Sequence, residues 1–252
     1  MLIDDRPDGV RVLTLNRPAK RNALNFELLE ALTQALLDPG GNTRAIILRG
    51  AGGRAFSAGF DLDELTGTAS DLEVDAAIGR AAVALSECPA PIVAQLEGHC
   101  HGGAVEIALN CDLRVATTDL EMSLRAVSLG VVYRTELLAR LVSTIGLGRT
   151  QQLLLGMPVL QAAEALAWGL VGEVLPVGEV AARVEAIAAA LAAGPASAVR
   201  GTKATLALLA RRAAGPDVVA AAESWRRAAA ESDERRRALD AAKAKLGRSG
   251  RK

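Results

Sequence analysis

The segment EGHCHGGAVEIALNCD, residues 97–112, is the most informative part of this 252-residue chain. An apolar run at 91–96 precedes it and predicts a buried strand. Two adjacent glycines, Gly102 and Gly103, are followed at once by an apolar segment with helical spacing. Backbone N–H groups are free at such a strand–turn–helix junction and can bind a negatively charged oxygen. Glu106 lies one helical turn further on, so its carboxyl is expected close to that oxygen site.

The composition argues against several classes of protein. The 29 basic and 29 acidic residues balance to a formal charge of zero, whereas nucleic-acid binding usually needs a basic surface. No apolar run approaches the length of a membrane span, and a signal peptide is not expected. Cys88, Cys100 and Cys111 are odd in number and form no CxxC pair. A cytoplasmic protein with free thiols, and with neither nucleic acid nor membrane as a partner, is therefore expected.

Hydrophobic periodicity divides the chain into an alternating part and a helical part. Strands are expected at 10–15, 44–49, 91–96 and 111–116. Helices are expected at 25–37, with Asn25 as N-cap, at 74–85 and after the Gly102–Gly103 turn. From about residue 144 the pattern is mostly helical, with breaks at 169–176, 194–195 and 215–216. This order predicts an α/β core over 1–190 and a helical region over 191–252.

A second glycine turn follows the strand expected at 44–49, in the segment RAFSAGFDLDEL at 54–65. Asp61, Asp63 and Glu64 suit the N-terminus of a helix. One interpretation is an ordinary turn with capping carboxylates. The other is that backbone N–H groups from both turns converge on one oxygen, which is the geometry that stabilises an enolate or oxyanion.

Five segments together carry a resemblance to a known family: NRPAKRNALN at 16–25, FSAGFD at 56–61, residues 97–112, GLGR at 146–149 and AAEALAWGLV at 162–171. The chain resembles the crotonase (enoyl-CoA hydratase/isomerase) superfamily from about residue 10 to 176. The resemblance implies a spiral of ββα repeats, with C-terminal helices that build homotrimers, often paired into hexamers. It also implies an acyl-CoA thioester as substrate, with coenzyme A as part of that substrate and no separate cofactor.

The resemblance assigns roles to individual residues. The backbone amides of Phe60 and Gly103 hold the thioester carbonyl, and Glu106 corresponds to the first of two hydratase glutamates. Residues implied in CoA binding are Lys20, Arg21, Ala23, Ala58, Asp61 and Leu62. Among these, Ala23 is expected near the adenine, and Lys20 or Arg21 near the phosphates.

The chain departs from the hydratases at the second glutamate, whose position holds Ala126. Water addition uses two positioned carboxyls, so hydratase activity would need a substitute, for which Glu136 is the nearby candidate. Leu-Gly-Val-Val-Tyr, ending at Tyr133, resembles the methylmalonyl-CoA decarboxylase branch. Loss of CO2 needs an oxyanion hole for the enolate, and Tyr133 could orient the carboxylate. That branch has His where this chain has Phe60.

Three functions remain open from the sequence. The first is decarboxylation of a malonyl-CoA-type thioester, such as methylmalonyl-CoA. The alternative is an enoyl-CoA hydratase or isomerase of acyl-CoA metabolism, and the third is a non-catalytic acyl-CoA binder. A nicotinamide-binding protein is a more distant alternative, because GAGGRA at 50–55 matches a dinucleotide-binding pattern but no clean helix follows it.

A metal site is a further alternative at His99-Cys100-His101. Alternation along a strand would place both imidazoles on one face. No further ligand cluster is visible in the sequence, so no metal is expected.

Overall fold

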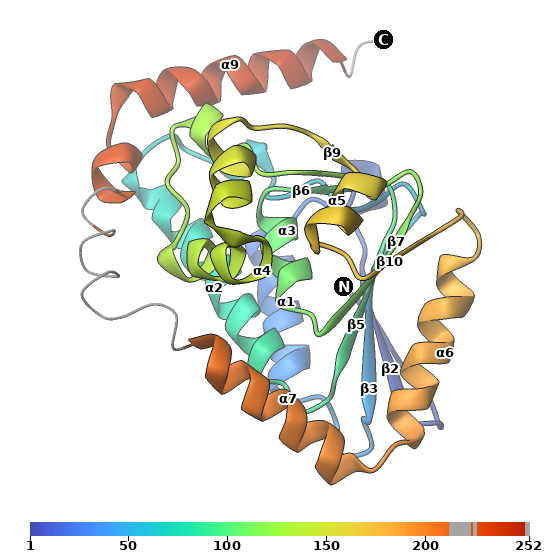
Figure 1. Cartoon of the computed structure of the whole chain (residues 1–252). Coiled ribbons are helices and arrows are strands. Elements are labelled where there is room, and N and C mark those ends of the chain that lie inside the picture. Colours follow the sequence, from blue (N-terminus) through green and yellow to red (C-terminus); the bar gives the residue numbers. More distant parts are fainter. Residues whose placement is uncertain (212–222, 224–225, 250–252) are drawn as a thin grey trace.

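Two sheets form the centre of the computed structural model, which describes residues 1–211, 223 and 226–249 (Figure 1). The larger sheet has the strand order β1-β2-β3-β5-β7-β10. Its strands are β1 (Leu2–Asp5), β2 (Val10–Leu15), β3 (Ala45–Gly50), β5 (Ile92–Leu96), β7 (Leu113–Thr117) and β10 (Glu173–Leu175). The smaller sheet, in the order β4-β6-β8-β9, contains β4 (Ala55–Ser57), β6 (His99–His101), β8 (Glu121–Ser123) and β9 (Leu160–Gln161).

The strands are paired with helices in a repeating order. In β3-β4-α2, β5-β6-α3 and β7-β8-α4, the first strand of each repeat joins the larger sheet and the second joins the smaller sheet. The helices of the repeats are α2 (Leu72–Glu87), α3 (Gly103–Leu109) and α4 (Thr135–Leu155). Strands β3, β5 and β7 pair in parallel, so the first strand of each repeat lies beside the first strand of the repeat before it. The expected spiral of ββα repeats is thereby confirmed.

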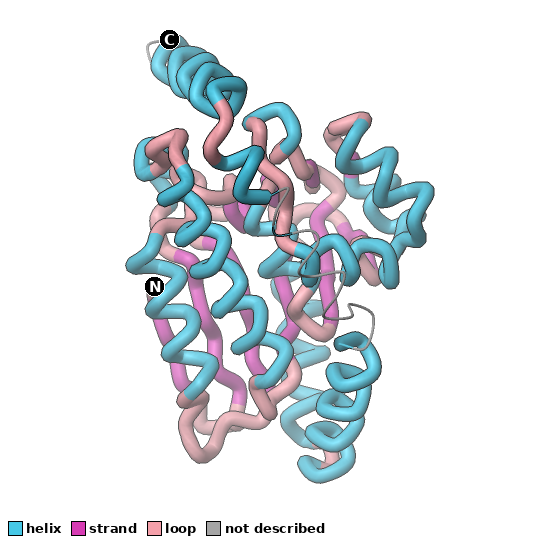
Figure 2. Tube along the Cα trace, turned by 90° about the vertical axis from the view of Figure 1, so that its left-hand side faces the viewer, coloured by secondary structure: helices cyan, strands magenta, loops and turns pink. Residues whose placement is uncertain are grey.

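Both faces of the larger sheet are covered, as Figures 1 and 2 show. The residues of β2 alternate between the two cores: Val10 and Val12 pack against α6 (Val180–Ala193), and Leu13 and Leu15 pack into the main core. That main core lies under α2 and under α1 (Phe26–Leu37). Because both faces of β2 are covered, the strand is buried along its whole length, including Arg11 and Thr14.

The expected elements of the first half of the chain are present within a few residues. Strands β2, β3, β5 and β7 and helices α1 and α2 occur at their predicted places. Asn25 caps α1, because its side-chain oxygen accepts a hydrogen bond of 3.0 Å from the amide of Leu28. The three cysteines are free and buried, as expected for free thiols.

Among the described residues, five helices occupy the part of the chain in which a mostly helical pattern was expected. Helix α4 begins at Thr135, earlier than the residue 144 expected, and bends at Gly146. The break at 169–176 contains β10, and the remaining helices are α5 (Ala162–Trp168), α6, α7 (Ala196–Arg211) and α9 (Asp233–Ser249). The break expected at 215–216 lies outside the described residues. The assembly of trimers or hexamers through 191–252, and the division at residue 190, stay predictions.

Among the described residues, no single helix is both long and apolar enough to cross a membrane. The pair α6 and α7 reaches that length and composition only together, across a bend of 109°. In this structure the buried side of α6 faces the larger sheet.

Four short 3-10 turns complete the architecture around the site. They are η1 (Pro18–Lys20), η2 (Leu62–Glu64), η3 (Ala69–Asp71) and η4 (Val127–Leu129). The second glycine turn leads into η2 rather than into a full helix. Asp61 caps it, because its side chain accepts a hydrogen bond of 3.2 Å from the amide of Asp63.

Candidate active site

A cavity of about 470 Å³ lies between the smaller sheet and helices α2 and α9. Its wall includes Phe60 from the loop after β4, Gly103 at the start of α3 and Tyr133 from the segment before α4. Ala126, at the position of the second hydratase glutamate, also lines it and carries no ionisable group. The structure therefore brings three of the four predicted catalytic residues to one cavity, and Glu106 does not line it.

The amides of Phe60 and Gly103 are free to bind a ligand. Around the first, the amide of Leu24 donates to the carbonyl of Gly59 at 2.7 Å, and the amide of Asp61 donates to the carbonyl of Leu24 at 2.8 Å. This pairing passes over Phe60 and leaves its N–H without an acceptor in the described part of the chain. Gly103 is the first residue of α3, so its N–H has no intrahelical partner either.

Glycine is required just before each of these amides. Gly59 has a φ of +89°, and a Cβ there would lie 2.6 Å from the carbonyl oxygen of His101. Gly102 has a φ of 55° and a ψ of −126°, a region that residues with a Cβ avoid. The two turns thus lie against each other, and their conformation directs both amides to the cavity. This arrangement fits an oxyanion hole.

The residues implied in CoA binding separate into two groups. Arg21, Ala58 and Leu62 line the cavity. The others do not line it: Lys20 pairs with Asp63 at 2.5 Å, Asp61 pairs with Arg17 at 3.0 Å, and Ala23 is buried.

Arg17 was not singled out from the sequence, although it organises this loop. Its guanidinium donates to the carbonyl of Ala23 at 2.8 Å and to the carboxylate of Asp61 at 3.0 Å. Asp61 and Ala23 therefore contribute to the shape of the loop in this structure, and Arg17 joins them.

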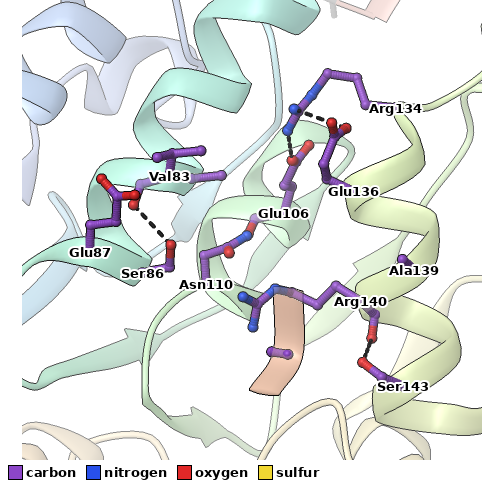
Figure 3. Close-up of a pocket in the computed structure, with 12 residues that line it drawn as sticks. Val83, Ser86, Glu87, Glu106, Asn110, Arg134, Glu136, Ala139, Arg140 and Ser143 are labelled. Atoms are coloured by element: carbon purple, nitrogen blue, oxygen red, sulfur yellow. Dashed lines mark hydrogen bonds and ion pairs between the residues drawn. The ribbon is translucent and has the colours of Figure 1, made fainter. Parts of the chain in front are cut away.

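Glu106 is buried on α3 and opens onto a second pocket of about 350 Å³ (Figure 3). Its carboxyl points at the guanidinium of Arg134, with which it forms an ion pair. Burial raises the pKa of Glu106 to about 7, an effect that Arg134 opposes and Asp75 reinforces. A carboxyl with a pKa near 7 can both accept and donate a proton at neutral pH.

Arg134 also connects α2 to this pair. Its Nε lies 3.8 Å from a carboxylate oxygen of Asp75, which in turn forms an ion pair with Arg226. Burial raises the pKa of Asp75, against the effect of the two guanidinium groups. Gly79 makes room for Arg134 on α2, because a Cβ there would lie 2.5 Å from the guanidinium. Asp75 lines the cavity and Glu106 the second pocket, so Arg134 links the two spaces.

Tyr133 faces the cavity with its hydroxyl against the backbone of Ala126. Burial raises the pKa of this hydroxyl, and the nearby Glu106 and Asp75 raise it further. Tyr133 therefore stays neutral and can donate a hydrogen bond to a bound carboxylate. Glu136, the candidate substitute for the missing glutamate, is 57% exposed and contacts Arg134 at 3.3 Å. It lines the second pocket and not the cavity.

Helix α9 closes one side of the cavity through a buried ion pair. Arg235 on α9 contacts Asp71 at 2.5 Å, and both residues line the cavity. Burial alone would raise the pKa of Asp71, but hydrogen bonds from Thr66, Arg235 and Gly67 hold it below its ordinary value. Arg235 also donates to the carbonyl of Leu129 at 3.2 Å. Neither residue was singled out from the sequence, because their positions are 164 residues apart.

The two histidines lie on one face of β6, as their spacing predicts, and both line the cavity. Cys100 between them is fully buried on the other face. The structure adds a carboxylate that the sequence did not indicate, because Glu121 on β8 pairs in register with His99. No further ligand cluster was visible in the sequence, and the structure places this carboxylate near both histidines; the expectation that no metal is bound stays a prediction.

Comparisons with known proteins agree with this geometry. The family model described as enoyl-CoA hydratase/isomerase matches residues 5–246. YngF of Bacillus subtilis, whose name assigns it to the enoyl-CoA hydratases/isomerases, is 34% identical over 207 residues, covering 81% of this chain and 80% of its own. A crotonyl-CoA hydratase of Syntrophomonas wolfei is 31% identical over 209 residues, covering 81% of this chain and 80% of its own.

A solved structure shares nearly the whole fold. Methylmalonyl-CoA decarboxylase, in complex with 2-nitronate-propionyl-CoA, has a TM-score of 0.90 and 27% identity to this chain, covering 97% of this chain and 96% of its own. The family model spans almost the entire sequence, and the relatives match it over four fifths of their length. This chain therefore belongs to the enoyl-CoA hydratase/isomerase family.

Proposed function

We propose that this chain is an enzyme of the enoyl-CoA hydratase/isomerase type, in which Glu106 transfers a proton on an enoyl-CoA thioester. One observation carries the proposal: two unpaired amides, Phe60 and Gly103, face one cavity one helical turn from a buried carboxyl whose pKa is about 7. Such an arrangement combines an oxyanion hole with a group that exchanges protons at neutral pH.

The amides act on the thioester carbonyl. When a proton leaves the α-carbon, the electron pair moves onto the carbonyl oxygen and forms an enolate. The N–H groups of Phe60 and Gly103 donate to that oxygen and stabilise its charge more than they stabilise the neutral carbonyl. They lie in a turn that Gly59 and Gly102 hold in place, so little reorganisation is needed when the charge forms.

Glu106 supplies the proton transfer. As a carboxylate it takes a proton from the α-carbon of a 3-enoyl thioester and returns it to the γ-carbon, so that the double bond moves from C3–C4 to C2–C3. When substrate is bound, its side chain leaves Arg134 and turns toward the cavity. This migration needs one carboxyl, whereas water addition in the hydratases uses two, and Ala126 supplies none. Isomerisation is therefore the preferred reaction within the type.

Decarboxylation of a malonyl-CoA-type thioester is the second candidate. It is favoured by Tyr133, which faces the cavity beside Ala126, and by the likeness to the decarboxylase structure. Breaking the bond between the α-carbon and the carboxylate would leave its electron pair on the same enolate, and CO2 would depart. The tyrosine hydroxyl would orient the carboxylate before that bond breaks.

A panel of thioesters separates these functions. Purified protein would be incubated separately with a 3-enoyl-CoA, crotonyl-CoA and methylmalonyl-CoA, and mass spectrometry would follow the products. We expect conversion of the 3-enoyl-CoA to the 2-enoyl isomer, with loss of at least about 100-fold in kcat for Glu106→Gln, and little change for Tyr133→Phe. CO2 release that depends on Tyr133 and not on Glu106 would replace the proposal with the second candidate. Tight binding of all three without product would identify a non-catalytic binder.

A further inference from the structure

Three side chains on two neighbouring strands form a cluster of metal-ligating groups. His99 and His101 are the only two histidines of the chain, and Glu121 lies on the adjacent parallel strand. One donor atom from each lies within 4.8 Å of the other two. All three residues line the cavity that contains the free amides.

The cluster exists because two strands are in register. His99 pairs with Glu121 and His101 with Ser123 across β6 and β8. Alternation along β6 sends Cys100 into the core and leaves both imidazoles on the cavity side. The rings lie side by side, with centroids 5.3 Å apart. The arrangement therefore follows from the backbone and does not depend on a flexible loop.

His101 already has a hydrogen-bond partner that would orient its ring as a metal ligand. Its Nδ1 lies 2.9 Å from the hydroxyl of Ser123, which leaves Nε2 for a ligand when Nδ1 carries the hydrogen. Such a hydrogen bond to the second ring nitrogen is the usual support of a metal-binding histidine.

His99 carries the clearest sign of a missing partner. Its Nδ1 is buried and makes no well-formed hydrogen bond among the described residues, although a carboxylate oxygen of Glu121 lies 3.3 Å away. A buried polar atom without a hydrogen-bond partner is costly. A cation between the two would satisfy both.

We propose that His99, His101 and Glu121 bind one divalent transition-metal ion of the Zn²⁺ class. Two imidazoles and one carboxylate are a donor set that suits Zn²⁺, Co²⁺ or Ni²⁺ better than Mg²⁺ or Ca²⁺, which favour oxygen ligands. Donor atoms around a tetrahedral Zn²⁺ lie roughly 3.4 Å apart, given bonds of about 2.1 Å. The His99–Glu121 pair already has that spacing, and a donor atom of His101 lies within 4.8 Å of both.

The remaining coordination position faces the cavity. Three protein ligands and one open position are typical of a site where a metal contacts water or a ligand, and not of a closed structural site. Arg21 and Arg125 line the same cavity, and their positive charges disfavour a cation there. The carboxylate of Glu121 offsets part of that charge. We therefore expect one exchangeable metal ion per chain, bound when the metal is supplied.

Direct binding tests the proposal without any assay of acyl-CoA turnover, so its failure and that of the proposed function are distinguishable. EDTA-treated and dialysed protein is titrated with Zn²⁺ by calorimetry and with Co²⁺ by visible absorption. Proton NMR follows the ring signals of the two histidines. We expect one ion per chain and shifts of both histidine signals. The buried thiols contribute no cobalt–thiolate absorption in folded protein.

Variants locate the ion. His99→Gln, His101→Gln and Glu121→Gln should each weaken Zn²⁺ binding by at least about 10-fold, since loss of an outer-shell partner alone costs about 10- to 100-fold. Glu30→Gln, an exposed carboxylate on α1, is the matched control and should bind as the parent does. If His101→Gln does not fold, His99→Gln still tests the site. The His99 side chain is 30% exposed, so its replacement should be tolerated by the fold. Absence of one-to-one binding, or unchanged binding in His99→Gln and Glu121→Gln, overturns the proposal.

Discussion

Replacing Glu106 by glutamine should remove a large part of the pH dependence of folding stability. The pKa of Glu106 is about 7 in the folded chain and 4.5 in its ordinary state. As the pH rises from 4.5 to 7, the unfolded state releases this proton while the folded state keeps it, so stability falls over that window. One pKa step corresponds to about 1.4 kcal/mol, so the loss between pH 5 and pH 8 is about 2 to 3 kcal/mol.

Urea unfolding at one fixed protein concentration, from pH 5 to pH 8, measures this effect. Glu106→Gln should lose less stability than the parent over that range, by about 2 to 3 kcal/mol. Glu136→Gln is the matched control, because it removes a carboxylate that contacts the same Arg134 guanidinium but is 57% exposed. A parent and a Glu106→Gln variant whose stability changes in parallel with pH would refute the raised pKa and the proton-transfer role built on it.

Three further predictions follow from single contacts. Gly59→Ala should lower kcat by about 100- to 1,000-fold, as loss of an oxyanion donor does, because the new Cβ meets a backbone carbonyl at 2.6 Å. Gly53 also has a positive φ, but a Cβ there meets open space. Gly53→Ala should therefore keep the activity in the same steady-state assay. Asp71→Asn should destabilise by about 3 to 5 kcal/mol in urea unfolding, since it leaves a buried guanidinium without its charge partner; an unchanged midpoint would contradict this. Asn25→Ala should cost about 1 kcal/mol by loss of the α1 cap, measured the same way.

Strands β2, β3, β5 and β7 of the larger sheet could be predicted because each is a mainly apolar run, whereas the exposed β1 and the short β10 were not predicted as strands. Strand β2 and strand β5 are buried throughout, and a cap at Asn25 marks the start of α1. The strands of the smaller sheet have only two or three residues, too few for a period-2 pattern to appear. They pair with strands that lie far apart in the chain, and local sequence does not specify such pairing.

The candidate site was predictable where it depends on glycine turns and not where it depends on long-range ion pairs. Phe60, Gly103 and Tyr133 reach one cavity, as expected. Arg134 lies in a segment without periodic pattern, and its contact with Glu106 joins residues 28 apart in sequence. The one local sign was Gly79 inside α2, where a side chain would exclude the guanidinium. A glycine in a helix can have many causes, so Gly79 alone did not predict that Arg134 packs against it.

The Asp71–Arg235 contact has a consequence for the order in which the molecule is made. Both sheets and the two residues of the proposed oxyanion hole, Phe60 and Gly103, are synthesised before α9, yet α9 supplies part of the cavity wall. During translation the proposed catalytic groups therefore exist first in an open cavity, and the last segment encloses it. A chain cut after α7 would retain the spiral core and the two amides, but a substrate would meet water on the side that Arg235 now covers.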